Sequence, residues 1–387
     1  MKTVYRIIKN TKVLKGFIII ILFFGLFLET ALGQSTLQPI SISIPHVAFT
    51  NPSIIGEGKK DPSLFEEISQ LINAVPSGET IHVAVFKLNE PLIIRALLQA
   101  EKRGVSVNVI IDEGSTSNET NLPTIPMLEE KINTFYAFDN DISKKSIIHN
   151  KFLICSKIVT TKGKIPNIIL QTSANFQKKD AEKLQDLLII QNKKIYDGYL
   201  KYWKIMEKLG KNNNWDSYAF FTASDDKSGY SANFLPLQKK DKSEKKDVVL
   251  DILKQIDNPT KTKIFASITK WDEGRDKVLE KLEQLQKKGT EMKIIISKLD
   301  DKEMRELIKD AADEVNVLNK KEARMHTRYI LIDGIVNGEQ TQLILTGSPN
   351  LTKRSLRYNF EVLLVLENHE HIFKQYISHF EACKALD

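Results

Sequence analysis

Cysteine is scarce in this chain, and the spacings that mark common metal and nucleotide sites are missing. Among the 387 residues, the cysteines are Cys155 and Cys383. No CxxC, HExxH or P-loop spacing occurs, so we expect neither a metal nor another cofactor. Because Cys155 falls inside an apolar, strand-like run and Cys383 lies near the C-terminus, we expect two buried free thiols rather than a disulfide.

A long apolar run is also missing at the N-terminus, where a transmembrane helix would need about 20 such residues. The run Phe17–Leu28 is shorter, follows several basic residues and precedes the small residues Ala31-Leu32-Gly33. This order is typical of a secretory signal peptide. We therefore expect cleavage near Gly33 and a secreted or periplasmic mature protein, with an uncleaved anchor as the alternative.

The net positive charge is small when the expected signal peptide, called the leader below, is left out. The formal net charge is +7, and residues 1–33 carry five basic residues and one acidic residue, so the remainder carries +7 − 4 = +3. The composition, 42% hydrophobic and 27% charged, is ordinary for a globular protein, and the length suits two domains. Charge alone therefore does not argue for a nucleic-acid partner.

One polar pattern occurs twice. His149 stands two residues before Lys151, and His326 stands two residues before Arg328. A Ser-x-Asn string follows each pair, and an acid follows each serine after 13 residues; these residues are Ser173, Asn175 and Asp186 in the first copy and Ser348, Asn350 and Glu361 in the second. A single histidine in an apolar strand is most often a core residue, but the same order in two copies favours a shared site.

The surrounding sequence repeats as well, which predicts a tandem duplication. Each copy reads as helix, strand, helix and strand before its histidine; the helices are expected at 62–75, 91–102, 245–256 and 275–288, and the strands at 81–86, 105–111, 264–269 and 292–296. This alternation predicts βαβ units in mostly parallel or mixed sheets with helices on both faces. We expect an N-terminal extension at 34–60, one domain at 61–210, a linker at 211–246 and a second domain at 247–387.

The paired motifs resemble the HxKx4D and GSxN motifs of the phospholipase D superfamily. The resemblance implies two α/β/α domains related by pseudo-twofold symmetry, with the motifs meeting at their interface. It also implies that His149 is the nucleophile and His326 the general acid, although the residues alone permit the reverse. Two positions depart from the pattern: Ser156 stands where the first motif has aspartate, and Arg328 stands for lysine in the second. Asp333 keeps the aspartate, which odd spacing along the strand turns away from the phosphate face.

Phosphodiester cleavage without a metal needs a nucleophile, a proton donor and cations for the phosphoryl oxygens. Lys151 and Arg328 are expected to neutralise those oxygens, and Asn175 and Asn350 to donate hydrogen bonds to them. We expect Ser173 and Ser348 to support the histidines or the phosphate loop. Asp186 and Glu361 are expected to orient an imidazole each.

Three functions fit these residues. The first is a secreted phospholipase D-like hydrolase of phospholipid headgroups, with peripheral membrane contact. The second is a nuclease that uses the same histidines, and the third is a catalytically impaired phosphate-binding protein, because Arg for Lys is not a conservative exchange at a bidentate site. One chain supplies both motifs, so we expect a monomer.

Overall fold

The computed structural model describes residues 36–114, 118–138, 146–212, 218–237, 246–297, 302–318 and 324–386. The expected signal peptide lies outside these residues. In the first half the elements are β1 (His46–Phe49), α2 (Pro52–Gly56), α3 (Ser63–Asn73), β2 (Thr80–Val85), α4 (Pro91–Lys102), β3 (Ser106–Asp112), α5 (Asn118–Asn121), α6 (Ile125–Leu128), β4 (Thr134–Phe138), β5 (Lys151–Thr160), β6 (Gly163–Thr172), β7 (Lys183–Leu184), β8 (Asp186–Gln191) and α7 (Lys193–Asn212).

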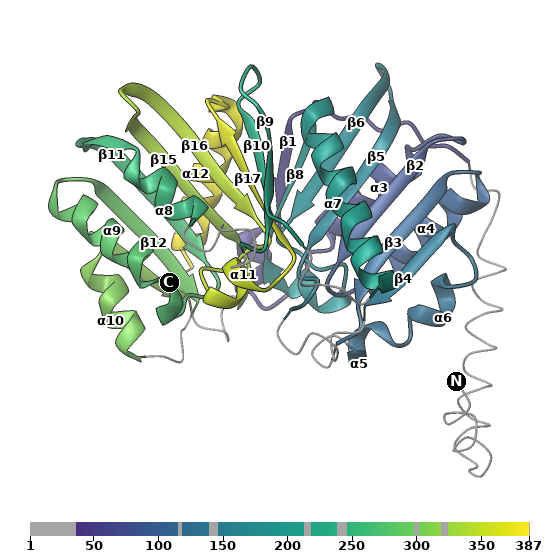
Figure 1. Cartoon of the computed structure of the whole chain (residues 1–387), viewed down its shortest axis with the longest axis horizontal. Coiled ribbons are helices and arrows are strands. Elements are labelled where there is room, and N and C mark those ends of the chain that lie inside the picture. The colour runs from purple at the N-terminus through teal and green to yellow at the C-terminus, as the bar shows by residue number, and fades with distance from the viewer. Residues whose placement is uncertain are drawn as a thin grey trace, which may run out of the picture.

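The second half repeats this order with an added hairpin at its start. Its elements are β9 (Phe221–Asp225), β10 (Tyr230–Leu235), α8 (Val248–Lys254), β11 (Ile256–Ile268), α9 (Asp276–Lys287), β12 (Glu291–Ser297), α10 (Lys302–Asp310), β13 (Glu314–Leu318), β14 (Arg324–Met325), β15 (Arg328–Val336), β16 (Glu339–Gly347), α11 (Lys353–Arg357), β17 (Glu361–Glu367) and α12 (Glu370–Lys384). The two halves lie side by side in Figure 1.

Each half is built on one mixed sheet. The strand order is β1-β8-β6-β5-β2-β3-β4 in the first and β13-β12-β11-β15-β16-β17-β10-β9 in the second. Parallel pairing joins β2, β3 and β4, and likewise β11, β12 and β13, where helices connect consecutive strands. The strands that carry the motifs pair antiparallel. The expected α/β fold with mixed sheets is thus confirmed, and within each of the two large sheets the parallel pairing is confined to three strands at one side.

Alternating side chains pack helices against both faces of each sheet. In β5, Leu153 belongs to the core beneath α3 and α4, whereas Phe152 packs edge-on against Tyr199 of α7, with ring centroids 4.9 Å apart. The local signals act as expected in the helices: Asp247 caps α8 by accepting from the N–H of Leu250, and α4 spans the residues predicted for it. Cys155 and Cys383 are buried and free, as predicted.

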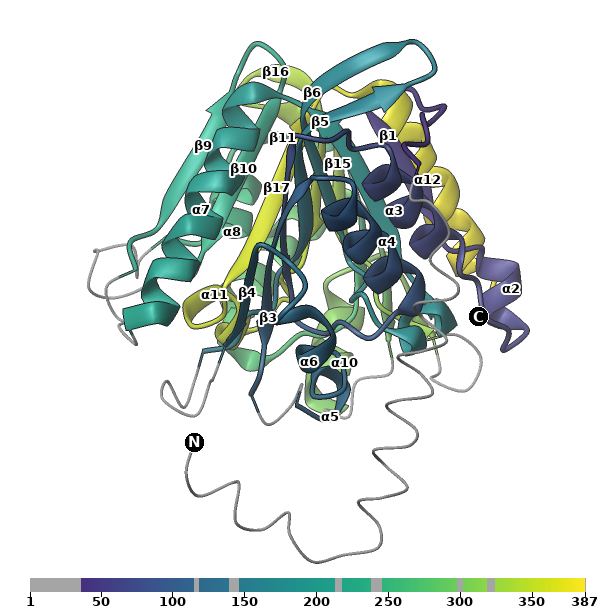
Figure 2. The same cartoon turned by 90° about the vertical axis from the view of Figure 1, so that its right-hand side faces the viewer.

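The two halves meet through β7 and β14, which pair in parallel, and through helices that pack on strands of the opposite half. β1 pairs with β8 at the edge of the first sheet, and β10 pairs with β17 in the second. Figure 2 shows α12 beside β1 and α2, and α7 beside β9 and β10. Tyr376 of α12 packs on Phe49 of β1, and Tyr199 of α7 packs on Phe234 of β10, with centroid distances of 5.0 and 5.2 Å. One core therefore runs through both halves.

The segments expected as extension and linker contain folded elements. β1 and α2 lie within residues 34–60, and β9 and β10 lie within residues 211–246. The hairpin forms because Phe221 and Phe234 stack at 4.6 Å while the backbone of β10 bonds to β17. Within the part of the chain that the structure describes, no helix has the length and apolarity needed to cross a membrane.

Candidate active site

The two histidines enter the junction by equivalent backbone contacts. The N–H of His149, just before β5, donates to the carbonyl of Phe360 at 3.0 Å, and the N–H of His326, just before β15, donates to the carbonyl of Leu184 at 2.9 Å. In each case the acceptor lies in the other half: Phe360 directly precedes β17, and Leu184 lies two residues before the start of β8. Each histidine is therefore held by the opposite half, and both imidazoles face the same junction.

His149 is paired with a buried carboxylate. Its Nδ1 lies 2.9 Å from Oε2 of Glu361, which has no exposed surface, and Asn359 donates to the other carboxylate oxygen at 3.0 Å. Burial lowers the pKa of His149 to about 4 despite Glu361. Burial alone would raise the pKa of Glu361, but His149 and Lys151 hold it below its usual value. The resting pair is thus a carboxylate accepting from Nδ1–H, which leaves the Nε2 lone pair of His149 for attack.

His326 has a neutral partner instead. Its Nδ1 lies 3.0 Å from Oε1 of Gln185, and Arg328 places one guanidinium nitrogen 3.0 Å from its Nε2. Because Arg328 can only donate, Nε2 accepts and the proton sits on Nδ1. Burial, Arg328 and Lys183 lower the pKa of His326 well below its ordinary value. Lys151 and His149 lower the same pKa further.

The expected acid in the first copy requires correction. Glu361 orients His149 as predicted, but Asp186 accepts from the hydroxyls of Thr346 and Tyr376, at 2.8 and 2.9 Å, and does not bond to His326. The backbone explains the error: the N–H of Ser173 donates to the carbonyl of Asp186, whereas the N–H of Ser348 donates to that of Val362.

Gln185, and not Asp186, is therefore the counterpart of Glu361. The second copy has one more residue between its serine and this position, an interval of 13 rather than 12. The sequence pattern paired Asp186 with Glu361 because each acid follows its serine by 13 residues, and this pairing was wrong. The signal that identifies Gln185 is the backbone pairing: Gln185 directly precedes Asp186, which accepts from the N–H of Ser173, and Glu361 directly precedes Val362, which accepts from the N–H of Ser348.

Lys151 is held within its own half, whereas Arg328 is held by both halves. Nζ of Lys151 donates to the carbonyl of His149 at 2.7 Å, and Lys151 is fully buried. Arg328 donates through Nε to Oδ1 of Asn350 at 2.7 Å and through another nitrogen to the carbonyl of Ser173 at 3.3 Å. A guanidinium shared in this way is pre-oriented as a fork for an anion.

The serines and asparagines support the site in unequal ways. The Oγ of Ser173 donates to Gln185 and accepts from the N–H of Asp186, and the Oγ of Ser348 accepts from the N–H of Val362. Asn175, expected to face phosphate, instead donates from Nδ2 to Asp180 at 3.1 Å. Asn350 orients Arg328, because its carbonyl oxygen accepts from the guanidinium.

The remaining motif position lies away from the histidines. Asp333 accepts from Gln340 and Gln342 at 2.8 and 3.2 Å, and Ser156 donates to Glu79 at 2.7 Å. The absence of aspartate at position 156 thus changes packing on a strand and not the phosphate face, as predicted.

Gly347, which opens the second Ser-x-Asn string, has a backbone that excludes side chains. Its φ is +148°, and a Cβ there would collide with the carbonyl oxygen of Val362. This close approach lets Ser348 reach β17. Among the described residues, no group of three or more His, Cys, Asp or Glu side chains is arranged to hold a metal ion.

Comparison with known proteins gives a family for both halves. The family "Cardiolipin synthase, PLD-like domain" matches residues 68–209 and 252–384. The chain is 26% identical over 131 residues to a phospholipase D of Rickettsia conorii, and 24% identical over 132 residues to one of Rickettsia prowazekii. Each match covers 32% of this chain and 56% or 54% of the relative, so it spans about half of the relative's length.

A solved structure shares the whole architecture. Phosphatidylserine synthase of Haemophilus influenzae superimposes with a TM-score of 0.60 at 11% identity, over 93% of this chain and 89% of that chain. This similarity concerns the fold. The two family matches cover more than half of the chain, and each contains one histidine, its cation and one Ser-x-Asn string. The chain therefore belongs to the phospholipase D superfamily.

Proposed function

We propose that this protein is a secreted phosphodiesterase of the phospholipase D type that hydrolyses phospholipid headgroup esters through a phosphohistidine. The observation that carries the proposal is the exchange of partners across the junction. Glu361 holds His149, Gln185 holds His326, and Lys151 and Arg328 stand beside them. Two imidazoles and two cations form the set that metal-independent phosphodiester cleavage requires.

The reaction then has two steps. In the first, Nε2 of His149 bonds to phosphorus, the bond from phosphorus to the leaving alcohol breaks, and His326 gives that oxygen a proton. The carboxylate of Glu361 offsets the positive charge that appears on the attacking imidazole. In the second, His326 takes a proton from water, the water oxygen bonds to phosphorus and the phosphorus–nitrogen bond breaks. One diester and one water become one phosphomonoester and one alcohol.

Substrate binding prepares His326 for the first step. At rest Arg328 occupies its Nε2, and positive neighbours keep the ring neutral. A phosphodiester anion gives the guanidinium a stronger acceptor and offsets the surrounding positive charge. Both changes raise the pKa of His326 and free Nε2 for a proton, so the acid forms when the substrate is in place.

Phospholipid is the substrate class that we favour over nucleic acid. The relatives at 26% and 24% identity carry the name phospholipase D, and the structural neighbour is named phosphatidylserine synthase. The chain without its leader carries only +3, which is little for a protein that must follow several phosphates.

A direct comparison of substrates tests this choice. With excess chelator, the mature protein should release headgroups from phosphatidylcholine or phosphatidylglycerol vesicles, and His326→Ala should not. Rapid cleavage of single-stranded DNA without headgroup release would establish the nuclease instead. If neither substrate is cleaved above the rate of the variant, the phosphate-binding alternative stands.

The leader supplies a second test of the proposal. If residues 1–33 form a signal peptide, the protein exported by a bacterial host should begin at Gln34, as read by N-terminal sequencing. Protein that remains membrane-bound with Met1 intact would instead identify an anchor.

A further inference from the structure

The side chains that support the two histidines differ at two matched positions, and the carboxylate stands at a different one of these positions in each copy. In the second copy the backbone N–H of Asn350 donates to the hydroxyl of Ser355, and in the first copy the N–H of Asn175 donates to Oδ2 of Asp180. Asp180 therefore occupies the place of Ser355, as Gln185 occupies the place of Glu361. The first copy therefore also has a carboxylate, but the side chain of Gln185 stands between this carboxylate and the imidazole.

We propose that Asp180 is a positioning residue that acts on His326 through the side-chain amide of Gln185. Together they do for His326 what Glu361 does alone for His149: they keep the proton on Nδ1 and reserve Nε2 for proton transfer. The inference rests on the proposed function, because it concerns the group that serves as acid and base there. Asp180 itself touches neither substrate nor reacting atoms.

The orientation of the Gln185 amide follows from its neighbours. Its Nε2 lies 3.2 Å from Oδ2 of Asp180, and an ionised carboxylate can only accept, so the NH2 group must face Asp180. The carbonyl oxygen then faces Nδ1 of His326 and the hydroxyl of Ser173, at 3.0 and 2.9 Å. Ser173 already accepts the N–H of Asp186, so its own hydrogen goes to Gln185. An oxygen that only accepts requires the proton of His326 to be on Nδ1.

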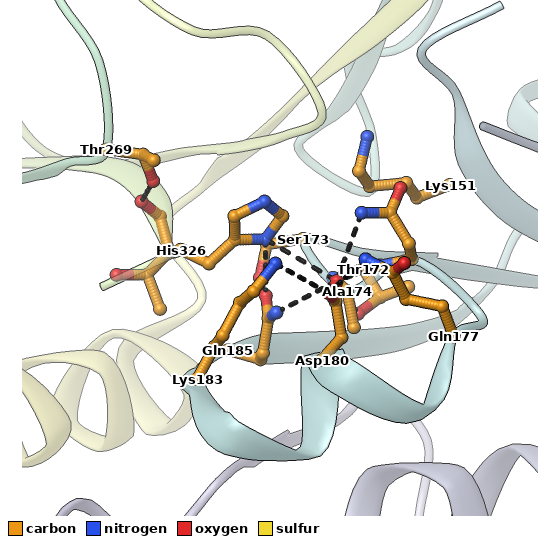
Figure 3. Close-up of polar contacts among 12 residues, drawn as sticks. Lys151, Thr172, Ser173, Ala174, Gln177, Asp180, Lys183, Gln185, Thr269 and His326 are labelled. Atoms are coloured by element: carbon orange, nitrogen blue, oxygen red, sulfur yellow. Dashed lines mark hydrogen bonds and ion pairs between the residues drawn. The ribbon is translucent and has the colours of Figure 1, made fainter. Parts of the chain in front are cut away.

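Asp180 is rigid enough for this task. It is 1% exposed and accepts from the backbone of Asn175, from Gln177 and from Lys183, the last two at 2.6 Å. Figure 3 shows these side chains gathered around its carboxylate, with His326 entering from the other half. Lys183 balances the charge of Asp180, and the network leaves the carboxylate little freedom to turn.

The arrangement sets the proton affinity of His326 as well as its tautomer. Oδ2 of Asp180 is 3.8 Å from Nδ1, beyond hydrogen-bond distance, so the ring has no direct anionic partner. The charged or titratable groups that act on it are Arg328, Lys183, Lys151, His149 and Asp180. Cations dominate this set. A carboxylate at position 185 would favour the imidazolium, so the amide keeps His326 neutral at rest.

Two variants separate positioning from a structural role. Asp180→Asn keeps the shape but lets the Gln185 amide turn. With inorganic phosphate bound, so that Arg328 no longer donates to Nε2, we expect a mixed tautomer of neutral His326 in 15N NMR. We also expect about a tenfold loss of kcat on bis-p-nitrophenyl phosphate. With Gln185→Glu added, both oxygens of the side chain at position 185 accept, so no neighbour has to orient it. Asp180→Asn with Gln185→Glu should regain the Nδ1–H tautomer and most of the activity, which a loss of loop structure would not permit.

The double variant should also move a pH profile in a defined direction. Its carboxylate raises the pKa of His326 by about one unit or more. With the activated nitrophenyl ester, His326 is needed as the base of the second step, so activity falls as pH drops through its pKa. The pH at the midpoint of the low-pH limb of kcat should therefore rise by the same amount. At a pH below this limb, the double variant should be about tenfold less active than the wild type.

Asp186→Asn is the matched control, since this buried carboxylate of the same half bonds to Thr346 and Tyr376. It should leave the tautomer of His326 unchanged. An unaltered tautomer in Asp180→Asn, or no rescue by Gln185→Glu, would overturn the inference. A wild-type protein that does not turn over the nitrophenyl ester would count against the proposed function, whereas the NMR tautomer still tests the inference.

Discussion

Replacing His149 by alanine should lower turnover of bis-p-nitrophenyl phosphate by a factor of at least about 10⁴ and abolish the phosphoenzyme. The reason is that no other group described at the junction combines a free imidazole nitrogen with a buried carboxylate partner, as Nε2 of His149 does with Glu361. Nitrophenol release would measure turnover, and protein quenched in alkaline denaturant, in which the phosphorus–nitrogen bond survives, would be analysed for the histidine adduct.

His326→Ala should behave differently with the same substrate. Nitrophenolate leaves without much help from an acid, so His149 still becomes phosphorylated, but the base for water attack is missing. We expect a burst of about one nitrophenol per protein, followed by a slow rate, and a nitrophenyl phosphoryl group trapped on His149.

His46→Ala is the matched control for both variants, because His46 pairs with Glu67 at 3.0 Å outside the site. It should retain wild-type turnover. A burst in His149→Ala with none in His326→Ala would reverse the two roles. Equal rates in the wild type and in all three variants would refute the proposal that this protein is an enzyme.

Glu361→Gln should cost about 10² to 10⁴ in kcat, although it changes one buried atom. The lost carboxylate no longer offsets the charge that develops on His149 during attack. The new amide can also present its NH2 group to Nδ1, which would shift the proton of His149 to Nε2 and remove the attacking lone pair. Single-turnover nitrophenol release measures the phosphorylation step directly.

The first copy supplies a matched rescue for this variant. Gln185 is kept in the correct orientation because Asp180 accepts from its NH2 group. Asn359 donates to Glu361 at 3.0 Å, so Asn359→Asp would provide the corresponding acceptor behind the amide that Glu361→Gln introduces. The double variant Asn359→Asp with Glu361→Gln should recover part of the lost rate. Rates that match wild type in Glu361→Gln alone would show that the carboxylate has no part in attack.

Most of the fold was predictable because short-range patterns carry it. An amphipathic pattern that ends at a glycine placed α4, and the repeated order of elements revealed two halves. The hairpin β9–β10 was not predicted, because its polar composition resembles a linker. Its stability comes from β17 and from Phe221 packed on Phe234, contacts between distant parts of the chain.

The candidate site divides in the same way. His149, Lys151, His326 and Arg328 were predicted from their repeated spacing, and the structure brings them to one junction. Asp186 was assigned by counting residues. Counting cannot detect the one-residue difference in the loop that follows each serine, since only the pairing of backbone groups reveals it.

The amino-acid sequence by itself therefore determined the duplication, the α/β fold and the identity of the histidines and cations, because these depend on residue type and local order. Only the tertiary structure decided which side chain holds each imidazole. Glu361 and Gln185 reach the histidine of the opposite half, and Asp180 stands behind one of them. Such contacts arise when two sheets pack across a shared core, so no spacing within either half encodes them.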